Sequence, residues 1–399
     1  MKLKLLSLMM LVCAAAPAFA QDYEGDAAKA RMQFGPLRVN PSIALTNAGV
    51  DNNVFNSPVP QSDFTMTLTP RADMWLRLSR SWVTFSAKED LVYYQKFVSE
   101  RSANSNYWAT LHVPLTRIAF NVRGAYLDTR DRPGFEIDAR SQHTQYDFGG
   151  SVELRLFGKT FAGVTANRTQ INFDRDQLYL GSDLSHELDR TMIDAGLTVR
   201  HQLTPLTSAT FSLEKQDDTF HYSHWRDSES MRIAGGLKFD PQGIISGGGQ
   251  VGFRHFQPVL GTVEGYDGLT ANADVSYRAL ASTRLGVQMM RDLQYSYEFE
   301  QPYYLQTGVT VTVSQLVGGP FDVVGKWGAY TLGYRGQIEA ASSLLDRTDS
   351  LRLFGGGVGY RFSKGTRFGF DVEQQQRISD APGRAYAGLR FGTSVRYGF

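Results

Sequence analysis

Cysteine, long apolar runs and helical periodicity are all scarce in this sequence of 399 residues. The single cysteine, Cys13, lies close to the start, so disulfides cannot stabilise the rest of the chain. Beyond Ala20 no apolar stretch approaches the roughly 18 residues that a membrane-spanning helix needs. The formal net charge of +1 gives no reason to expect nucleic acid or a strongly acidic protein as a partner.

The start of the chain is typical of a secretory signal peptide. Lys2 and Lys4 precede a short apolar run, which ends in the small-x-small sequence Ala18-Phe19-Ala20. We expect cleavage after this sequence and, at most, a short helix before the main domain. The expected division of the chain is a signal peptide over 1–20, a short periplasmic segment over 21–36 and a single outer-membrane barrel over 37–399.

The remaining chain alternates between apolar and polar residues with a period of two, as strands with one apolar face do. The last strand shows this best: Leu389, Phe391 and Val395 share one face, and Arg390 and Arg396 share the other. A terminal strand that ends on an aromatic residue resembles the assembly signal of bacterial outer-membrane barrels. The expected strands cover 37–54, 63–79, 82–95, 105–115, 117–129, 142–157, 160–173, 188–203, 207–220, 229–239, 243–256, 267–279, 282–297, 302–316, 321–334, 350–362, 365–377 and 384–399.

The connections between these strands alternate in length. Short turns rich in Gly, Pro and Ser, such as 157–159 and 318–320, alternate with longer polar loops, such as 130–141 and 174–187. Eighteen strands, an even number, and short turns at one rim are typical of a transmembrane antiparallel β-barrel. The sequence therefore predicts an all-β barrel in the bacterial outer membrane with both termini in the periplasm. The mean hydropathy of -0.29 agrees, because half of each such strand faces water.

The apolar face of each strand is expected to contact lipid, and the polar face to line the lumen. The lumen face carries more basic than acidic residues, which would concentrate anions in the pore. Cross-strand ion pairs that stiffen the wall explain the same residues equally well. The basic residues expected to line the solute path are Arg123, Arg155, Arg200, Arg232, Arg254, Arg278, Arg284, Lys326, Arg361, Arg367, Arg384, Arg390 and Arg396.

Aromatic residues cluster at strand ends, where barrels carry interfacial girdles. Glu89 and Arg291 break the apolar face of their strands, and we expect each to lie at a bulge or near a rim. The girdle expected at the short turns contains Phe157, Phe239, Phe321, Phe362, Tyr397 and Phe399. The girdle expected at the other rim contains Tyr93, Tyr94, Tyr295, Tyr297, Tyr303 and Tyr304.

We expect the loops to be too short to block an aqueous channel of this strand number fully. Lumen glycines, for example Gly149, Gly357 and Gly359, would leave bare wall or relieve strand curvature. A wide and smooth lumen of this kind would suit a long polar polymer.

An enzyme is the alternative from another class. His221 and His224 lie beside Asp227 and Ser228, but no catalytic motif surrounds them, and a solvated loop explains them better. The acidic loop 174–187 lacks the ligand spacing of a known calcium loop and is treated as surface charge. We expect no catalytic residues, cofactor or metal.

Several short segments carry a family resemblance: Pro41-Ser42-Ile43-Ala44, Thr69-Pro70-Arg71, the stretch 320–325 and the closing strand. On these residues the chain resembles the outer-membrane β-barrel porin family that is associated with exopolysaccharide operons. The resemblance implies a channel for secreted polysaccharide that works with synthesis and export proteins. The closest alternative is a passive porin for small anionic solutes. Membrane lipid, lipopolysaccharide and the barrel-assembly machinery are the other expected partners.

Overall fold

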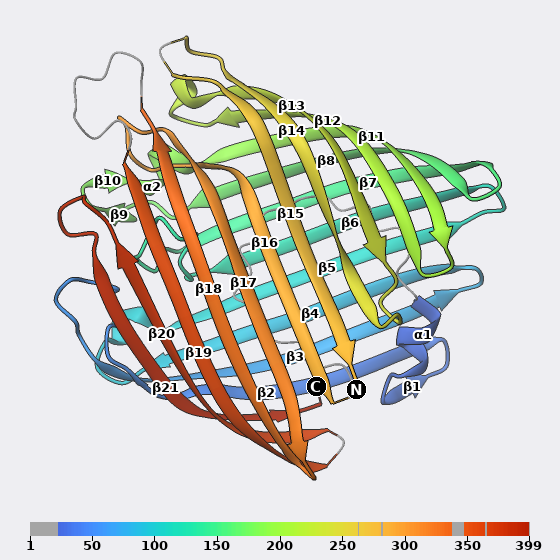
Figure 1. The fold of residues 1–399 in the computed structure, drawn as a ribbon, viewed down its shortest axis with the longest axis horizontal. Coiled ribbons are helices and arrows are strands. Elements are labelled where there is room, and N and C mark those ends of the chain that lie inside the picture. Colours follow the sequence, from blue (N-terminus) through green and yellow to red (C-terminus); the bar gives the residue numbers. More distant parts are fainter. Residues whose placement is uncertain (1–22, 262, 281, 337–346, 364, 399) are drawn as a thin grey trace.

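The computed structural model describes residues 23–261, 263–280, 282–336, 347–363 and 365–398, and the expected signal peptide lies outside this part of the chain. Eighteen long antiparallel strands close into a barrel (Figure 1). They are β2 (Leu37–Asp51), β3 (Asp63–Leu78), β4 (Ser81–Tyr94), β5 (Ser102–Pro114), β6 (Ile118–Thr129), β7 (His143–Phe157), β8 (Thr160–Phe173), β11 (Arg190–Thr204), β12 (Thr207–Phe220), β13 (Ser228–Phe239), β14 (Ile245–Pro258), β15 (Tyr266–Ala279), β16 (Thr283–Tyr295), β17 (Tyr303–Gly318), β18 (Phe321–Arg335), β19 (Thr348–Ser363), β20 (Thr366–Ile378) and β21 (Tyr386–Tyr397).

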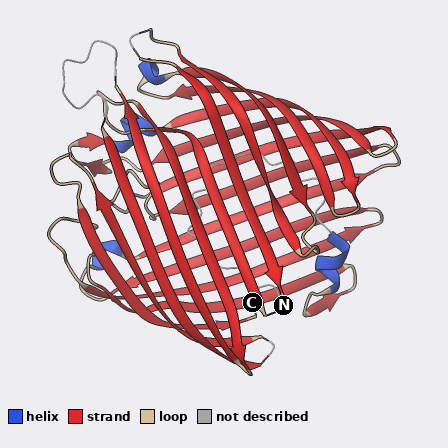
Figure 2. Cartoon of the chain, in the orientation of Figure 1, coloured by secondary structure: helices blue, strands red, loops and turns tan. Residues whose placement is uncertain are grey.

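The remaining elements are short, and the helices lie towards the ends of the barrel (Figure 2). They are α1 (Tyr23–Ala28), β1 (Met32–Phe34), η1 (Val98–Glu100), β9 (Leu178–Tyr179), β10 (Ser182–Asp183), α2 (Leu184–Leu188) and η2 (His224–Arg226). No helix in the described ranges is long and apolar enough to cross a bilayer.

Each barrel strand pairs with its neighbours in the sequence, and β21 pairs with β2 to close the wall. The predicted all-β barrel of eighteen strands is confirmed, with strand ends that differ from expectation by a few residues. Pairing of sequence neighbours needs only short connections, which explains why simple alternation was enough to find the strands.

The two rims differ in the length of their connections. The short-turn rim carries tight turns, such as Gly158–Lys159 and Gly319–Pro320, in which Gly158 and Gly319 have φ of +50° and +55°. Glycine adopts these angles without steric cost. The long-loop rim carries the segments that separate β6 from β7, β8 from β11 and β16 from β17.

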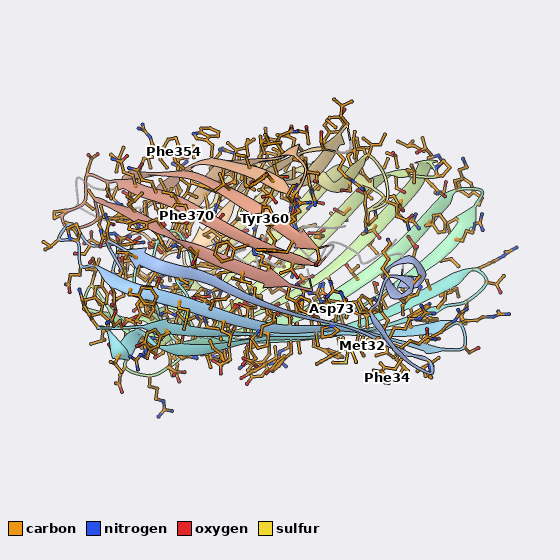
Figure 3. The ribbon with its side chains drawn as sticks, turned by 90° about the horizontal axis from the view of Figure 1, so that it is seen from below. Met32, Phe34, Asp73, Phe354, Tyr360 and Phe370 are labelled. Carbon is orange, nitrogen blue, oxygen red and sulfur yellow. The ribbon has the colours of Figure 1, made fainter. Side chains whose placement is uncertain are left out.

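The outside of the barrel is apolar, as Figure 3 shows for Phe354 and Phe370. Phe157 and Phe362, which were expected in the girdle at the short turns, are each 70% exposed at that rim. Phe399 lies outside the described residues.

The second expected girdle is wrong. Tyr297, Tyr303 and Tyr304 are at most 4% exposed, because the tip of the β16–β17 hairpin folds into the barrel. Leu293 and Tyr303 pack there with Phe256 of β14 in one apolar cluster. The alternation showed which side of a straight strand faces outward, and it could not show that a hairpin tip bends across the rim.

Arg291 marks the place where this bend begins. It pairs with Ala271, and beyond this pair β16 leaves β15 although β14 follows β15 up to Tyr266. The Arg291 guanidinium donates to the Leu269 carbonyl at 3.1 Å, on the stretch of β15 where pairing with β16 has ended. Arg291, which was expected to interrupt the lipid face, therefore supplies a hydrogen-bond donor to the backbone of β15 where pairing with β16 has ended.

Glu89 lies on the outer face and is held by its neighbours on β5. It accepts hydrogen bonds from the hydroxyls of Ser105 and Tyr107, and Ser105 is its cross-strand partner. These two donors satisfy the carboxylate on a face that is otherwise apolar, so Glu89 needs neither the expected bulge nor a position at the rim.

Candidate functional site

Most basic residues of the lumen wall are paired with acids on a neighbouring strand or on a strand two or three positions away. On the last two strands Arg390 lies 3.1 Å from Glu373, its cross-strand partner. The remaining wall pairs are Arg200–Glu153 (2.8 Å), Arg232–Glu214 (2.5 Å), Arg232–Asp292 (3.3 Å), Arg254–Asp292 (2.8 Å), Lys326–Glu373 (3.1 Å), Arg361–Asp322 (2.9 Å) and Arg367–Asp322 (2.7 Å). These pairs fix the guanidinium groups along the wall.

Other predicted lumen residues bind neutral groups. The guanidinium of Arg155 donates to the carbonyl of Gly158, and that of Arg278 donates to the carbonyl of Gly243. Arg284 donates to the Ser276 hydroxyl, and Arg123 lies over the ring of Trp108. None of these four contacts neutralises the positive charge of the arginine, because each contacted group is neutral.

Basic residues concentrate on the lumen face near the short-turn rim. Strand ends there bring many guanidinium or ammonium groups to one level. The acids beside them include Glu153, Asp240, Asp322 and Asp371, so the cations outnumber the acids. We call this set the basic collar. It consists of Arg38, Arg77, Arg155, Arg200, Lys238, Arg278, Arg284, Arg361, Arg367 and Arg396.

The lumen glycines provide room for side chains from neighbouring strands. A Cβ on Gly149 would lie 1.8 Å from Oδ1 of Asn167, and one on Gly357 would lie 2.2 Å from Oδ1 of Asp371. The wall at these glycines is therefore covered, and the expectation of bare wall is wrong there. Glycine is required at these positions because a long polar side chain lies flat across its backbone.

At the long-loop end, the segment between β6 and β7 crosses the lumen. The ring of Phe135 lies 4.3 Å from the ring of Tyr330, which belongs to β18 on the opposite side of the barrel by strand order. The carboxylate of Glu136 accepts a hydrogen bond from Ser296 at 2.6 Å, in the connection after β16. We call residues 130–142 the crossing loop. Its position means that the expected smooth lumen is wrong in this half of the barrel.

Two arginines hold the crossing loop from the far wall. Arg377 donates to the carbonyl of Glu136 at 2.9 Å and forms an ion pair with Asp138 at 2.9 Å. Arg384 donates to the same Glu136 carbonyl and, at 2.6 Å, to the hydroxyl of Tyr297. Arg377 and Arg384 are 1% and 3% exposed. Loss of one partner from such a buried pair typically costs about 3–5 kcal/mol, so the loop is firmly attached.

The two carboxyl groups of the crossing loop, Glu136 and Asp138, have raised pKa values. Burial raises the pKa of Glu136 to about 7, and the hydrogen bond from Ser296 and the charge of Arg384 only partly oppose this. Burial also raises the pKa of Asp138, against the opposing charge of Arg377. Glu136 therefore titrates near neutral pH within the contact that holds the loop in place.

The loop that was treated as surface charge is also part of the interior. Glu187 of α2 forms a 2.9 Å ion pair with Arg226, which is buried and also donates to the carbonyls of Ser296 and Pro302. Asp183 caps α2 by accepting from the backbone N–H of Ser185. Among the described residues no group of His, Cys, Asp and Glu could hold a metal ion.

The two histidines near Ser228 do not form a catalytic arrangement. His221 contacts Thr191 at 3.1 Å, whereas His224 contacts Asp227 at 3.3 Å. The Ser228 hydroxyl bonds instead to Tyr295 in the lumen, at 2.5 Å. Serine, histidine and acid therefore face different partners, and the geometry of a hydrolytic triad is not formed by these residues.

The model of a protein family described as "Putative beta-barrel porin 2" matches residues 30–399. The chain belongs to this β-barrel porin family. It is thus an outer-membrane channel protein, and the family resemblance inferred from the sequence is confirmed as a porin family. No curated protein matches the chain.

Solved porins are similar to this porin over most of their length. A BenF-like porin from Pseudomonas fluorescens Pf-5 has 10% identity and a TM-score of 0.49, over 91% of this chain and 99% of the other. OpdK of Pseudomonas aeruginosa, solved with vanillate, has 9% identity and a TM-score of 0.47, over 90% and 98%. OccK2 of the same organism, solved with glucuronate, has 11% identity and a TM-score of 0.46, over 90% and 97%.

Sequence reasoning missed the residues that narrow this porin. Glu136 and Asp138 were part of an ordinary surface loop, and Asp349, which shares Arg377 with Asp138, was not singled out. One signal was available, since Phe135 and Ile137 alternate with the two acids inside a loop that would otherwise be polar. Apolar residues in an exposed loop indicate that the loop packs against something.

Proposed function

We propose that this porin is a passive channel for small anionic solutes. The charge at one end of the barrel and the narrowing at the other both support this proposal. The basic collar favours anions at the short-turn mouth, because charge of one sign in a low-dielectric pore concentrates counter-ions. The crossing loop occupies part of the lumen at the other end, which favours small solutes over a polymer.

We propose that the short-turn rim faces the periplasm, as such turns do in barrels of this type. The exposed apolar belt would contact membrane lipid and, on the outer leaflet, lipopolysaccharide. The terminal strand β21 would be recognised by the barrel-assembly machinery. This orientation places the basic collar at the periplasmic mouth and the crossing loop on the outside.

Polysaccharide export, which the sequence resemblance implied, is the competing function. The basic collar would suit an acidic polymer, but the crossing loop would have to leave the lumen for a chain to pass. Deletion of the gene separates the two. We expect the amount of surface polysaccharide to be unchanged, and its loss would support export together with synthesis and export proteins.

Ion selectivity tests the proposal directly. The purified porin in a planar lipid bilayer, under a KCl gradient, is expected to give a reversal potential of the anion-selective sign. Replacing Arg278 and Arg284 with Glu should lower the chloride-to-potassium permeability ratio at least about twofold, because both lie in the collar and each change replaces a positive charge with a negative one. Cation selectivity of the unmodified porin would overturn the proposal.

A further inference from the structure

Three arginines of the basic collar stand side by side on consecutive strands. Arg361 of β19 is the cross-strand partner of Arg367 on β20, and Arg367 is in turn the partner of Arg396 on β21. Directly opposed residues have Cβ atoms about 5 Å apart, and like charges in this relation destabilise a sheet. We call these residues the arginine row. A fold that only needed ion pairs in its wall would not place three cations together.

One carboxylate neutralises part of this charge. Asp322 accepts from Arg361 at 2.9 Å and from Arg367 at 2.7 Å. Asp371, the other acid nearby, accepts from the Ser394 hydroxyl at 2.9 Å, and its charge also acts on Arg396. Three guanidinium groups thus face two carboxylates, of which only Asp322 forms ion pairs with them, and the row keeps an excess of positive charge.

The central guanidinium is fixed in place by the wall beneath it. A Cβ on Gly359 would lie 2.3 Å from Nη2 of Arg367, and one on Gly369 would lie 2.5 Å from its Nη1. Arg367 therefore lies flat over two glycines and is only 7% exposed. Its bonds to Asp322 fix the orientation as well as the position.

Arg396 completes the row without a partner of its own. Its Nε is buried and makes no hydrogen bond in the described structure. A planar guanidinium presents parallel N–H groups that match the oxygen atoms of carboxylate and phosphate, and a buried donor without an acceptor is costly to keep. The free donor lies beside an excess of positive charge, in the lumen of a channel.

We propose that the arginine row is a binding subsite for an oxyanion on its path through the pore. Arg396 and the outer edge of Arg361 donate to the oxygen atoms of the anion. Arg367, which is fixed by Asp322, lies between these two arginines and holds them at a constant spacing. This inference rests on the proposed anion channel and specifies the class of solute that the channel retains.

The test is block of chloride current by oxyanions in the full-length porin. Sulfate, phosphate and succinate are added at fixed KCl, and the concentration that halves the chloride current is measured for each. We expect sulfate to block at submillimolar to millimolar concentration, and Arg396→Gln to raise that concentration at least tenfold. Comparison of phosphate with succinate shows whether tetrahedral or carboxylate oxyanions are preferred.

Arg278→Gln is the matched control, because Arg278 belongs to the same collar but donates to a backbone carbonyl outside the row. It should leave sulfate block within about twofold of the unmodified porin. Because Arg396 lies in the terminal strand, Arg361→Gln serves as a second variant away from that strand, and the same tenfold weakening is expected.

Equal weakening by Arg278→Gln and the row variants, or an anion-selective porin that none of the three oxyanions blocks, would overturn the subsite. The second result would leave the proposed function standing, whereas cation selectivity would remove the proposed function itself.

Discussion

At the scale of single residues, the lumen depends on where side chains are missing. Gly308 pairs with Tyr330, and a Cβ on Gly308 would lie 2.0 Å from the tyrosine ring. The ring therefore lies across the glycine, with its hydroxyl bonded to Thr310 at 2.6 Å. From this position Tyr330 stacks on Phe135 of the crossing loop. One absent methyl group on β17 thus supports a contact that narrows the pore.

Gly308→Ala is expected to displace Tyr330, because an added methyl group cannot share that space. Overpacking of this kind costs about 1–3 kcal/mol, and loss of the Phe135 contact should also raise the single-channel conductance. Denaturant unfolding of the refolded porin and bilayer recording measure the two effects. Gly286→Ala is the control, since its Cβ would meet no atom closer than 3.9 Å, and it should change neither quantity appreciably.

At the scale of elements, the contact that holds the crossing loop against the barrel wall depends on pH. The free form of the loop would have Glu136 near the ordinary pKa of 4.5, and the bound form raises that pKa to about 7. Below about 4.5 both forms are protonated. Between pH 4.5 and 7 the bound form keeps a proton that the free form has lost, so rising pH weakens the attachment of the loop. Above pH 7 both forms have lost the proton, and the attachment changes no further.

Conductance of the porin is therefore expected to increase as the pH rises from 5 to 8, with the change concentrated below pH 7. Arg377 and Arg384 from the far wall, with Asp138 and Glu298 nearby, face the same carboxyl and set its environment. Glu136→Gln keeps the loop uncharged at this position, so conductance should stay low and vary much less with pH. An unchanged pH profile in this variant would contradict the role given to Glu136.

At the scale of the whole molecule, the wall was predictable and the contents of the lumen were not. Alternation and turn spacing depend on neighbours in the sequence, which are also neighbours in the barrel. The contact of Phe135 with Tyr330 joins opposite sides, and no periodicity encodes it. The inward bend that buries Tyr303 depends on packing against Phe256, again a contact between separate strands. The basic wall was visible as residue types, whereas the pairing that leaves Arg396 free required the register.

The orientation of the porin can be tested with single cysteines, because the only natural cysteine, Cys13, lies within the expected signal peptide. Gly261→Cys lies in the long loop after β14, and Lys159→Cys lies in the short turn after β7. A membrane-impermeant maleimide added to intact cells is expected to label the first at least about tenfold faster than the second. Permeabilised cells should label both, and the reverse order on intact cells would invert the proposed orientation.

The seam between β2 and β21 has a consequence for how the porin forms. Its register is interrupted between Leu45 and Ala48, where Asn47 has a φ of 54°, and it covers fewer residue pairs than the other barrel pairings. All other neighbouring strands in the wall are joined by a local connection. The first and last strands, β2 and β21, can pair only after all the strands between them have formed. Closure of the barrel is therefore a single late step. It costs more loop-closure entropy than any other pairing in the wall and forms fewer residue pairs in return. Until it happens, both edges remain open for templated pairing, and afterwards the membrane receives a wall with no edge at all.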